Sequence, residues 1–489
     1  MTGINEKQKR FIATAAIVVL AALFLFRYLA MTNEEIPLMD FYIGFETFAD
    51  KVFSNQLTIS DCFVLPHPIH WAPLGTPLQL FFLKVFKCNN LAYVYFGGGF
   101  LILTLIMVLV WANRTIRSGK LWVDILIYLG IAICMTNLNQ WEILDLWCSA
   151  AFMLRILLYF LVFLTVDRFL LKEKTKGGRT LLQGLGCGVL GGLVLILLSG
   201  AYYPGYIVAI SAVIILHVFL AKNEGKKEKG IALIALLIMI GSAAFVYLTT
   251  ASNAGISDGT AFGTDYLRGF FVMLGSTVIP QSSIPLTDFT EHIVVGVIIF
   301  LFVVETVIVF FKDRLYEKSW FPLMCLIYAG TSVAIIIYGR SDSYGFGTLT
   351  SSRYVVETTI GLLGIVMIQG MSISKHIREK GTKPAIRRAA GAVIALCVAG
   401  MVIYANVQEH KAGPYRKAYY QNMIRLALDI DNASDDELVV FQASASDVRS
   451  GIAAMKKYKL CLWAENSKYY QKEEPVTETI PAEAAGNAV

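Results

Sequence analysis

Ionisable and aromatic side chains gather in the segments between long apolar blocks, where they could do chemistry at a membrane boundary. Asp40 follows the first apolar block, and Gln140, Trp141, Glu142 and Asp145 stand at the start of a later one. A carboxylate that helices shield from water can act as a general base, which makes Asp40 a candidate; the alternative is a solvated loop acid. Glu142 and Asp145 share one face of the predicted helix and are further candidates, although a helix N-terminus stabilises acids without any function.

Two arginines stand in a segment rich in Gly and Ser, residues 339–353. These are Arg340 and Arg353, and Tyr354 follows the second. The planar guanidinium binds phosphate oxygens through paired hydrogen bonds. The pair therefore suggests a site for a lipid phosphate or pyrophosphate, with anchoring to lipid headgroups as the alternative.

Two other polar features have plainer explanations. Arg155 lies near the middle of an apolar block, where a charge costs about 2.5–3.5 kcal/mol. It needs a partner, and pairing with Glu305 or Glu357 is as reasonable as a role in ligand binding. His67 and His70 have a spacing that suits a metal site on a helix, but prolines flank His67 and no third ligand is specified.

The elements that must position these residues are membrane-spanning helices. The chain has 489 residues, of which 56% are hydrophobic and 16% charged, below the roughly 25% charged residues of soluble domains. The apolar blocks are about 18–22 residues long, which is the length of a helix that crosses a bilayer. We predict an all-α polytopic fold with about eleven spans: 11–31, 91–112, 121–138, 143–166, 181–199, 203–221, 230–250, 292–311, 320–338, 354–371 and 385–405.

Charge bias orients these spans. The alternate loops that begin with residues 1–10 hold 24 Lys and Arg residues, whereas the other loops before the C-terminal part hold 6. By the positive-inside rule the N-terminus is cytoplasmic and the C-terminus is outside. The first block, 11–31, is interpreted as a retained signal anchor. The basic residues stand in short loops, so the net charge of +6 does not indicate nucleic-acid binding.

Three regions follow from this topology. Residues 1–405 form the transmembrane domain with two long outer loops, 32–90 and 251–291; in the first, 74–86 is apolar but too short to span. Residues 406–467 form a small outer appendage, for which we predict an α/β structure with a helix at 415–428 and strands at 438–442 and 459–463. Residues 468–489 have a disordered composition. Spacing alone neither requires nor excludes a disulfide between Cys62 and Cys88 on the outer side.

Taken together, these residues resemble the GT-C superfamily of integral membrane glycosyltransferases, and within it a group of poorly characterised bacterial polytopic proteins. The resemblance covers roughly residues 10–410 and rests on order, spacing and membrane side. The residues that carry it are Asp40, Leu57 to Asp61 leading to His67-Pro-Ile-His70-Trp71, Gln140-Trp141-Glu142, Trp147, Gly339-Arg340 and Ser352-Arg353-Tyr354. This chain departs from the group's pattern where Ile69 and Trp71 flank His70, and at Asp145 and Cys148.

The resemblance implies transfer of a hexosyl or pentosyl group, with inversion, from a polyprenyl-phosphate donor to an envelope glycan, lipid or polymer. It implies the outer face of the bacterial cytoplasmic membrane. Asp40 would deprotonate the acceptor, Arg340 or Arg353 would neutralise the departing lipid phosphate, and Glu142 would position the acceptor or hold Mg²⁺ or Mn²⁺ with Asp40. The implied substrate-binding residues are His70, Gln140, Trp141, Asp145, Tyr202, Tyr203, Arg340, Arg353 and Tyr354, with Trp141, Tyr202 and Tyr203 stacking on sugar rings.

Two rival hypotheses remain at the level of sequence. A transporter or lipid flippase would place charges along a path through the membrane, which Arg155, Glu305 and His217 faintly suggest. A catalytically inactive scaffold in envelope-polysaccharide assembly would tolerate the departures from the family motifs.

Overall fold

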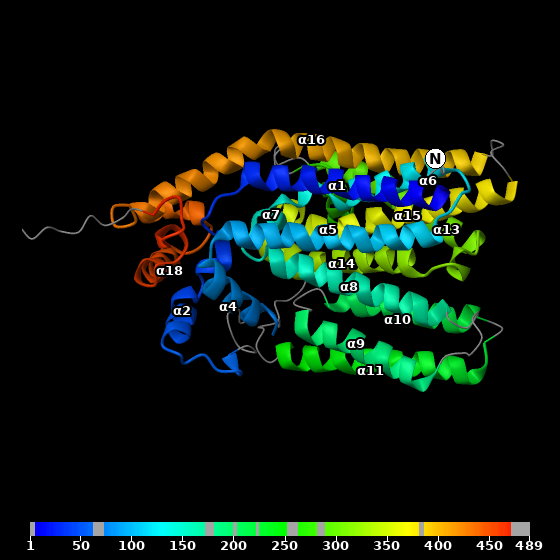
Figure 1. Ribbon diagram of the computed structural model, residues 1–489, viewed down its shortest axis with the longest axis horizontal. Helices are drawn as coiled ribbons and strands as arrows, with labels where there is room; N and C mark the ends of the chain where they lie inside the picture. Colours follow the sequence, from blue (N-terminus) through cyan, green and yellow to red (C-terminus); the bar gives the residue numbers. More distant parts are fainter. Residues whose placement is uncertain are drawn as a thin grey trace, which may run out of the picture.

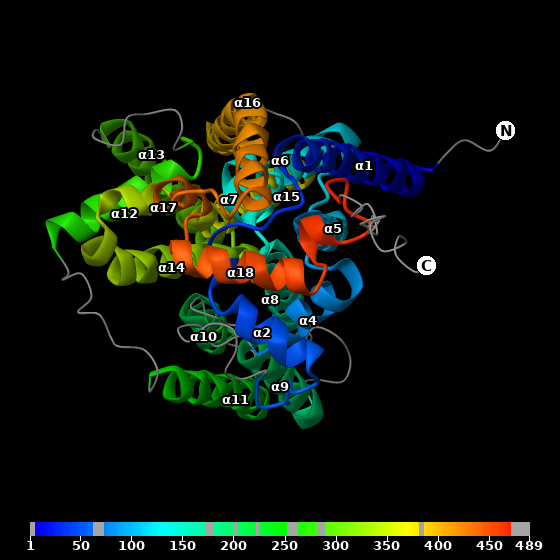
Figure 2. The ribbon, with the colours of Figure 1, turned by 90° about the vertical axis from the view of Figure 1, so that its left-hand side faces the viewer.

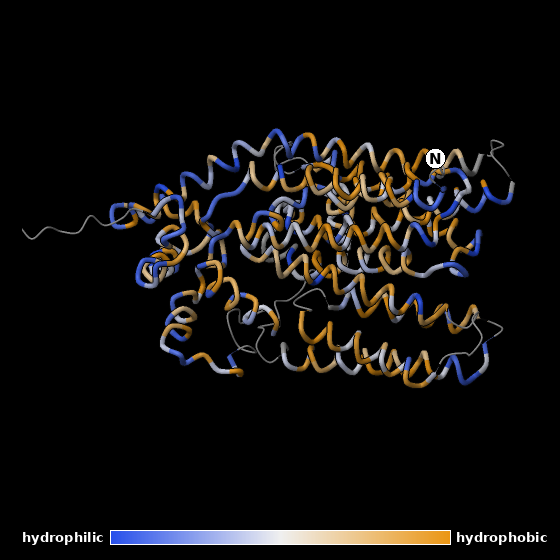
Figure 3. Tube along the Cα trace, viewed as in Figure 1, coloured by the Kyte–Doolittle hydropathy of each residue, from blue (hydrophilic) through white to orange (hydrophobic). Residues whose placement is uncertain are grey.

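The molecule is a bundle of long helices with a cap of short helices at one end. The computed structural model describes residues 5–61, 73–171, 180–198, 203–221, 224–251, 263–280, 289–380 and 386–470, and these residues contain no β-strand. Within them, ten helices are long and apolar enough to cross a membrane, and one apolar helix is shorter. Apolar residues occupy the middle of the bundle and hydrophilic ones its two ends (Figures 1 and 3). The predicted all-helical polytopic fold is confirmed.

Eleven helices correspond to the eleven predicted spans. They are α1 (Glu6–Thr32), α5 (Asn90–Thr115), α6 (Leu121–Met135), α8 (Ser149–Leu171), α9 (Leu181–Leu198), α10 (Tyr203–Leu220), α11 (Lys226–Ala251), α13 (Thr290–Lys312), α14 (Phe321–Tyr344), α15 (Val355–Lys380) and α16 (Ile386–Leu428). The span predicted at 143–166 begins late, because Leu146 is extended, with φ −82° and ψ 154°. That break separates the short helix α7 (Trp141–Asp145) from α8.

Helix α15 forms the centre of the bundle, where a buried ion pair joins three helices. Arg155 of α8 meets Glu357 of α15 at 2.5 Å, and both side chains are at most 4% exposed. The hydroxyl of Tyr328 on α14 donates to the same carboxylate. The predicted need of Arg155 for a partner is thus met by Glu357. Glu305 instead accepts a hydrogen bond from Gln369, at 2.6 Å.

The predicted α/β appendage is wrong, because this part of the chain is helical. Beyond the bundle, α16 leads to α17 (Asp435–Leu438), η9 (Val439–Phe441), α18 (Ala445–Lys457) and η10 (Cys461–Trp463). A capping box between Ser434 and Glu437 starts α17, which leads directly into η9, where the first strand is predicted. At the second predicted strand, Lys459 and Cys461 have φ near +51° and +52°, which a β-strand does not allow. We call this end of the bundle the appendage end.

The first long loop folds against the appendage. It contains η1 (Met39–Tyr42), α2 (Phe45–Phe53) and α4 (Gly75–Phe86), and Figure 2 shows α18 lying beside α2 at this end. Asp50 accepts hydrogen bonds from Tyr458 at 2.5 Å and from Lys457 at 3.0 Å, and the rings of Phe53 and Tyr458 stack at 4.3 Å. The apolar stretch 74–86 is the short helix α4. The second long loop contributes α12 (Thr264–Ser276).

The Arg155–Glu357 pair generates a stability prediction. Glu357→Ala leaves the Arg155 charge buried without its carboxylate, so we expect a loss of about 3–5 kcal/mol in unfolding free energy. Thermal unfolding in detergent micelles measures the change. The control is Glu317→Ala, whose pair with Arg314 is 45% and 67% exposed and worth under about 1 kcal/mol. Equal losses in the two variants would contradict the prediction.

Candidate functional site

Residues 137–145, at the appendage end, form a segment that links α6 and α7 to α12, α15 and α16. After α6 the chain turns through η2 (Leu138–Gln140) into α7. The Asn137 amide donates to the Thr277 carbonyl at 3.0 Å and to the Thr359 hydroxyl at 3.1 Å. The Leu138 N–H donates to the Asn406 side chain at 2.7 Å. Because these bonds reach the end of α12, α15 and α16, they fix the position of the residues that follow, which include Glu142.

Glu142 joins this segment to the loop that carries Arg353. Its carboxylate is buried, and it accepts hydrogen bonds from Ser351 Oγ at 2.7 Å, Ser352 Oγ at 3.2 Å and the Arg353 N–H at 3.1 Å. Its second oxygen meets Arg353 Nε at 3.1 Å, and the Glu142 N–H donates to Ser352 Oγ. Two motifs about 210 residues apart in the sequence are therefore in direct contact.

Arg353 is held at its base while its side chain remains partly in solvent. It lies in η8 (Ser352–Tyr354), directly after η7 (Phe346–Thr350). Its Nε also donates to Ser351 Oγ at 2.9 Å, and 41% of the side chain is exposed. Tyr354 is buried, with its ring 5.9 Å from the Arg353 guanidinium. A guanidinium is thus held at its base by Glu142 and Ser351, while part of its surface remains exposed.

Asp40 lies on the first long loop, near the break between α7 and α8. It is exposed on η1, after Met39 in the left-handed conformation at φ 63°. Its neighbour Phe41 packs against Trp147, at the break between α7 and α8, with ring centroids 5.6 Å apart. Cys148 follows Trp147 at this break. Burial raises the pKa of its thiol to about 12, and the carboxyls of Asp40 and Glu142 act in the same direction. Asp40, Glu142 and Arg353 therefore lie in one region around this break.

The other residues of the Gln140-Trp141-Glu142 region have partners within the protein. Asp145 is buried and accepts hydrogen bonds from Asn33 at 2.7 Å and Thr32 at 3.1 Å. Gln140 donates to a backbone carbonyl of α6. The Trp141 ring is covered by the guanidinium of Arg416 on α16, 3.6 Å from its centroid. These contacts stabilise the segment beneath Glu142.

The remaining candidates are spread more widely. Arg340 is half-buried on the last turns of α14, just before η7, and Tyr203 opens α10. His70 and Tyr202 lie outside the described residues, as do His67 and Cys62. Sequence reasoning missed Arg268 of α12, whose guanidinium lies 5.3 Å from the ring of Phe346 in η7.

Sequence reasoning also missed the role of Arg416 and of the serines around Glu142. The signal for Ser351 and Ser352 was present, because they directly precede Arg353 and can donate to a carboxylate. Arg416 gave no such signal. It follows Pro414 in a polar stretch of α16, and its contact with Trp141 depends on how two distant helices pack.

The described residues do not fit a divalent cation at Asp40 and Glu142. No group of three or more His, Cys, Asp or Glu side chains in the described ranges is placed to hold a metal ion. Both Glu142 oxygens already bind Arg353 or the serine hydroxyls, so a cation would have to displace these donors. We derive no step through a metal.

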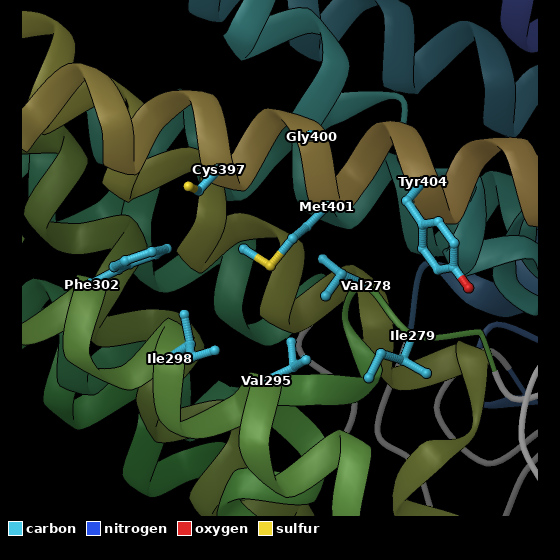
Figure 4. Close-up of a pocket in the computed structure, with 9 residues that line it drawn as sticks. All are labelled: Val278, Ile279, Val295, Ile298, Phe302, Cys397, Gly400, Met401 and Tyr404. Carbon is cyan, nitrogen blue, oxygen red and sulfur yellow. The ribbon is translucent and has the colours of Figure 1, made fainter.

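An apolar groove opens beside the segment that holds Glu142. Its volume is about 450 Å³, and it is lined by residues from the end of α12, from α13 and from α16: Val278, Ile279, Val295, Ile298, Phe302, Cys397, Gly400, Met401 and Tyr404 (Figure 4). Ile279 follows closely on Thr277, which binds Asn137, and Tyr404 lies two residues before Asn406, which binds Leu138. One end of the groove thus lies at the same level of the bundle as the η2 turn.

Comparison with known proteins gives structural similarity only. No protein-family model matches the chain, and no curated protein matches it. The similar solved structures include two of ArnT from Cupriavidus metallidurans, one in the apo state and one bound to undecaprenyl phosphate. They share 11% identity with this chain, cover 91% of it and 89% and 88% of their own chains, and give TM-scores of 0.44 and 0.43.

The Glu142 contacts generate a prediction about loop order. Glu142→Gln keeps the size of the side chain but removes the charge that binds Arg353 and its neighbours. We expect a loss of about 2 kcal/mol in unfolding free energy and faster hydrogen exchange at the amides of 351–354. Glu291→Gln, at an exposed acid in the first turn of α13, is the control. Unchanged exchange at 351–354 would show that Glu142 does not hold the loop.

Proposed function

We propose that this protein is a membrane glycosyltransferase of the GT-C type. It transfers a hexosyl or pentosyl group from a polyprenyl-phosphate donor to an envelope glycan, lipid or polymer at the appendage end, which faces outward from the bacterial cytoplasmic membrane. The observation that carries the proposal is the position of an exposed carboxylate, Asp40, and a held, partly exposed guanidinium, Arg353, near the break between α7 and α8, where Phe41 packs on Trp147 and Arg353 pairs with Glu142.

The two groups suit the two halves of a displacement at the anomeric carbon. Asp40 accepts the proton of the acceptor hydroxyl as its oxygen bonds to the anomeric carbon. The bond from that carbon to the phosphate oxygen breaks, and its electron pair leaves with the polyprenyl phosphate. Arg353 stabilises the negative charge that develops there, with Arg340 and Arg268 as further cations near η7. Attack opposite the leaving group inverts the anomeric centre.

The groove supports a lipid donor. Its lining is apolar except for the Tyr404 hydroxyl and the Cys397 thiol, and its volume lies in the range of small-ligand pockets. It lies between helices that span the apolar layer, and one end is at the level of η2. An isoprenoid chain in the groove would place its phosphate toward the segment that positions Glu142 and Arg353. Such a donor also suits an outward-facing site, where nucleotide sugars are scarce.

The contacts of three charged residues favour an enzyme over a transporter. Arg155 is bound to Glu357, and Glu305 accepts a hydrogen bond from Gln369. His217 meets Glu224 at 2.5 Å and accepts a hydrogen bond from Trp320 at 3.1 Å. These contacts tie helices and loops to one another, as expected of structural pairs. The Asp40→Asn variant described below distinguishes the enzyme from an inactive scaffold.

The role of Asp40 predicts a selective loss of activity. Asp40→Asn preserves shape but removes the base, so we expect transfer to fall by about 100-fold or more while the protein stays folded and membrane-bound. The measurement is glycan analysis of the envelope in a deletion strain that expresses either form. Glu46→Gln, at another exposed acid of the same loop, should restore the glycan fully.

Either of two results would overturn this assignment. Full restoration by Asp40→Asn would remove Asp40 as the base and leave the inactive-scaffold hypothesis or a different site. No change of any glycan on deletion would remove the transferase function, and movement of lipid or solute would then be measured.

The groove predicts a specific effect on the lipid donor. A Cβ added at Gly400 meets no atom within 4 Å, so Gly400→Phe is tolerated by the backbone and fills the groove. We expect KM for a long-chain polyprenyl donor to rise about tenfold, while turnover of a short-chain donor is unchanged. Gly241→Phe on α11, where a Cβ also meets open space, is the matched control. Equal KM values in both variants would place the isoprenoid chain elsewhere.

A further inference from the structure

Two cysteines from opposite ends of the chain meet at the appendage end. Cys88 lies between α4 and α5, and Cys461 begins η10; both carry free thiols. The Cys461 N–H donates to the Lys87 carbonyl at 2.6 Å. The Cys461 thiol donates to the Glu35 carbonyl at 3.2 Å, and the Tyr93 hydroxyl lies 3.9 Å from Cys88 Sγ. Both sulfurs therefore belong to one buried cluster.

The backbone geometry at this contact suits a covalent link. Covalent dimensions on each side of the 2.6 Å hydrogen bond keep the two α-carbons within about 7 Å, and disulfide-bonded pairs usually span roughly 4.4–6.8 Å. Lys87, Cys88 and Cys461 all have positive φ, at 55°, 58° and 52°. Non-glycine residues in this region cost about 1–3 kcal/mol each, so the surrounding structure must hold this conformation.

The environment of the thiols decides when they can react. Cys88 is 0% exposed and Cys461 is 1% exposed. Burial raises the pKa of Cys88 to about 12, and burial together with Cys88 raises the pKa of Cys461. Since the thiolate is the reactive form, the buried thiols are inert in the folded state. Oxidation must take place as the appendage docks, before the cluster closes.

We propose that Cys88 and Cys461 form a disulfide bond that staples the appendage to the first long loop. Each thiol loses one proton and one electron, and the two electrons pass to a protein-disulfide oxidant outside the membrane, which is reduced to a dithiol. The proposal rests on the outward orientation of the appendage end, which is part of the proposed function, but not on glycosyl transfer.

The staple would add one covalent constraint between distant parts of the chain. The bond closes a loop that contains most of the chain, and long loops gain most from closure in the chain-entropy description of disulfides. The first long loop, which the bond would hold against the appendage, contains η1. Tyr42 of η1 packs against Phe441 of the appendage, with ring centroids 5.5 Å apart. Because η1 also carries Asp40, the staple would limit the movement of that carboxylate.

The test is a direct map of the bond in the full-length protein. Membranes from cells that export disulfide-bonded proteins are acid-quenched, free thiols are blocked with a maleimide, and the protein is digested without reductant. We expect a peptide pair that links Cys88 to Cys461. Maleimide on both residues, or a pair that links Cys62 to Cys88, would overturn the proposal. This map does not depend on activity, so its failure and the failure of Asp40→Asn are distinguishable.

Thermal unfolding with and without reductant gives an independent measurement. Reductant should lower Tm of the wild type by about 3–6 °C and should leave Cys88→Ser, Cys461→Ser and the double variant unchanged. The Tm of the double variant should be no lower than that of the less stable single variant. Cys134→Ser, at a buried cysteine of α6, keeps the response to reductant as the control. Equal responses in the wild type and the double variant, or none in the wild type, would overturn the proposal.

Discussion

A buried carboxylate needs hydrogen-bond donors, and the donors that Glu142 requires determine how several segments pack at the appendage end. Its two oxygens receive two hydroxyls, one backbone N–H and one guanidinium nitrogen. Leaving such a group without donors costs several kcal/mol, so the loop that supplies them must stay closed against α7. The same demand fixes the base of Arg353 while its side chain reaches water. The burial of one carboxylate thus determines where a partly exposed guanidinium stands at the surface.

The appendage packs on the first long loop, which carries Asp40. Tyr458 and Lys457 bind Asp50, and the ring of Phe441 packs on Tyr42 of η1. Buried Glu34, just beyond α1, accepts hydrogen bonds from Lys468 at 2.5 Å and from Tyr469 at 3.2 Å. These contacts show that the appendage packs on the first long loop, next to the turn that contains Asp40.

The spans could be predicted from the sequence because a helix that crosses the bilayer needs one continuous apolar block of about 20 residues, which is visible locally. The break at Leu146 could not, since it depends on a turn held by Asn406 and Thr277 from distant helices. The strands predicted at 438–442 and 459–463 failed for a related reason. Short apolar runs suit a strand or a helical turn equally. Here the capping box at Ser434 and the positive φ of Lys459 and Cys461 favour turns.

The candidate site could be predicted in part. Asp40, Glu142 and Arg353 stood out by type and position, and the structure brings them together. Asp145, Gln140 and Trp141 stood out for the same reasons, but their partners are protein groups. Sequence shows which polar residues are unusual near a membrane; it does not show whether their partners are substrates or other side chains, because Arg416 and Asn33 lie far away along the chain.

Helix α16 is longer than any bilayer is thick. Its 43 residues extend for about 64 Å, against a hydrocarbon core of about 30 Å, and it runs from the bundle to the appendage without interruption (Figure 1). About half of the helix therefore extends beyond the apolar layer, with Pro414 inside it. One element thus connects the membrane-embedded bundle to the appendage, so the tilt of this helix in the bilayer and the position of the appendage are not independent.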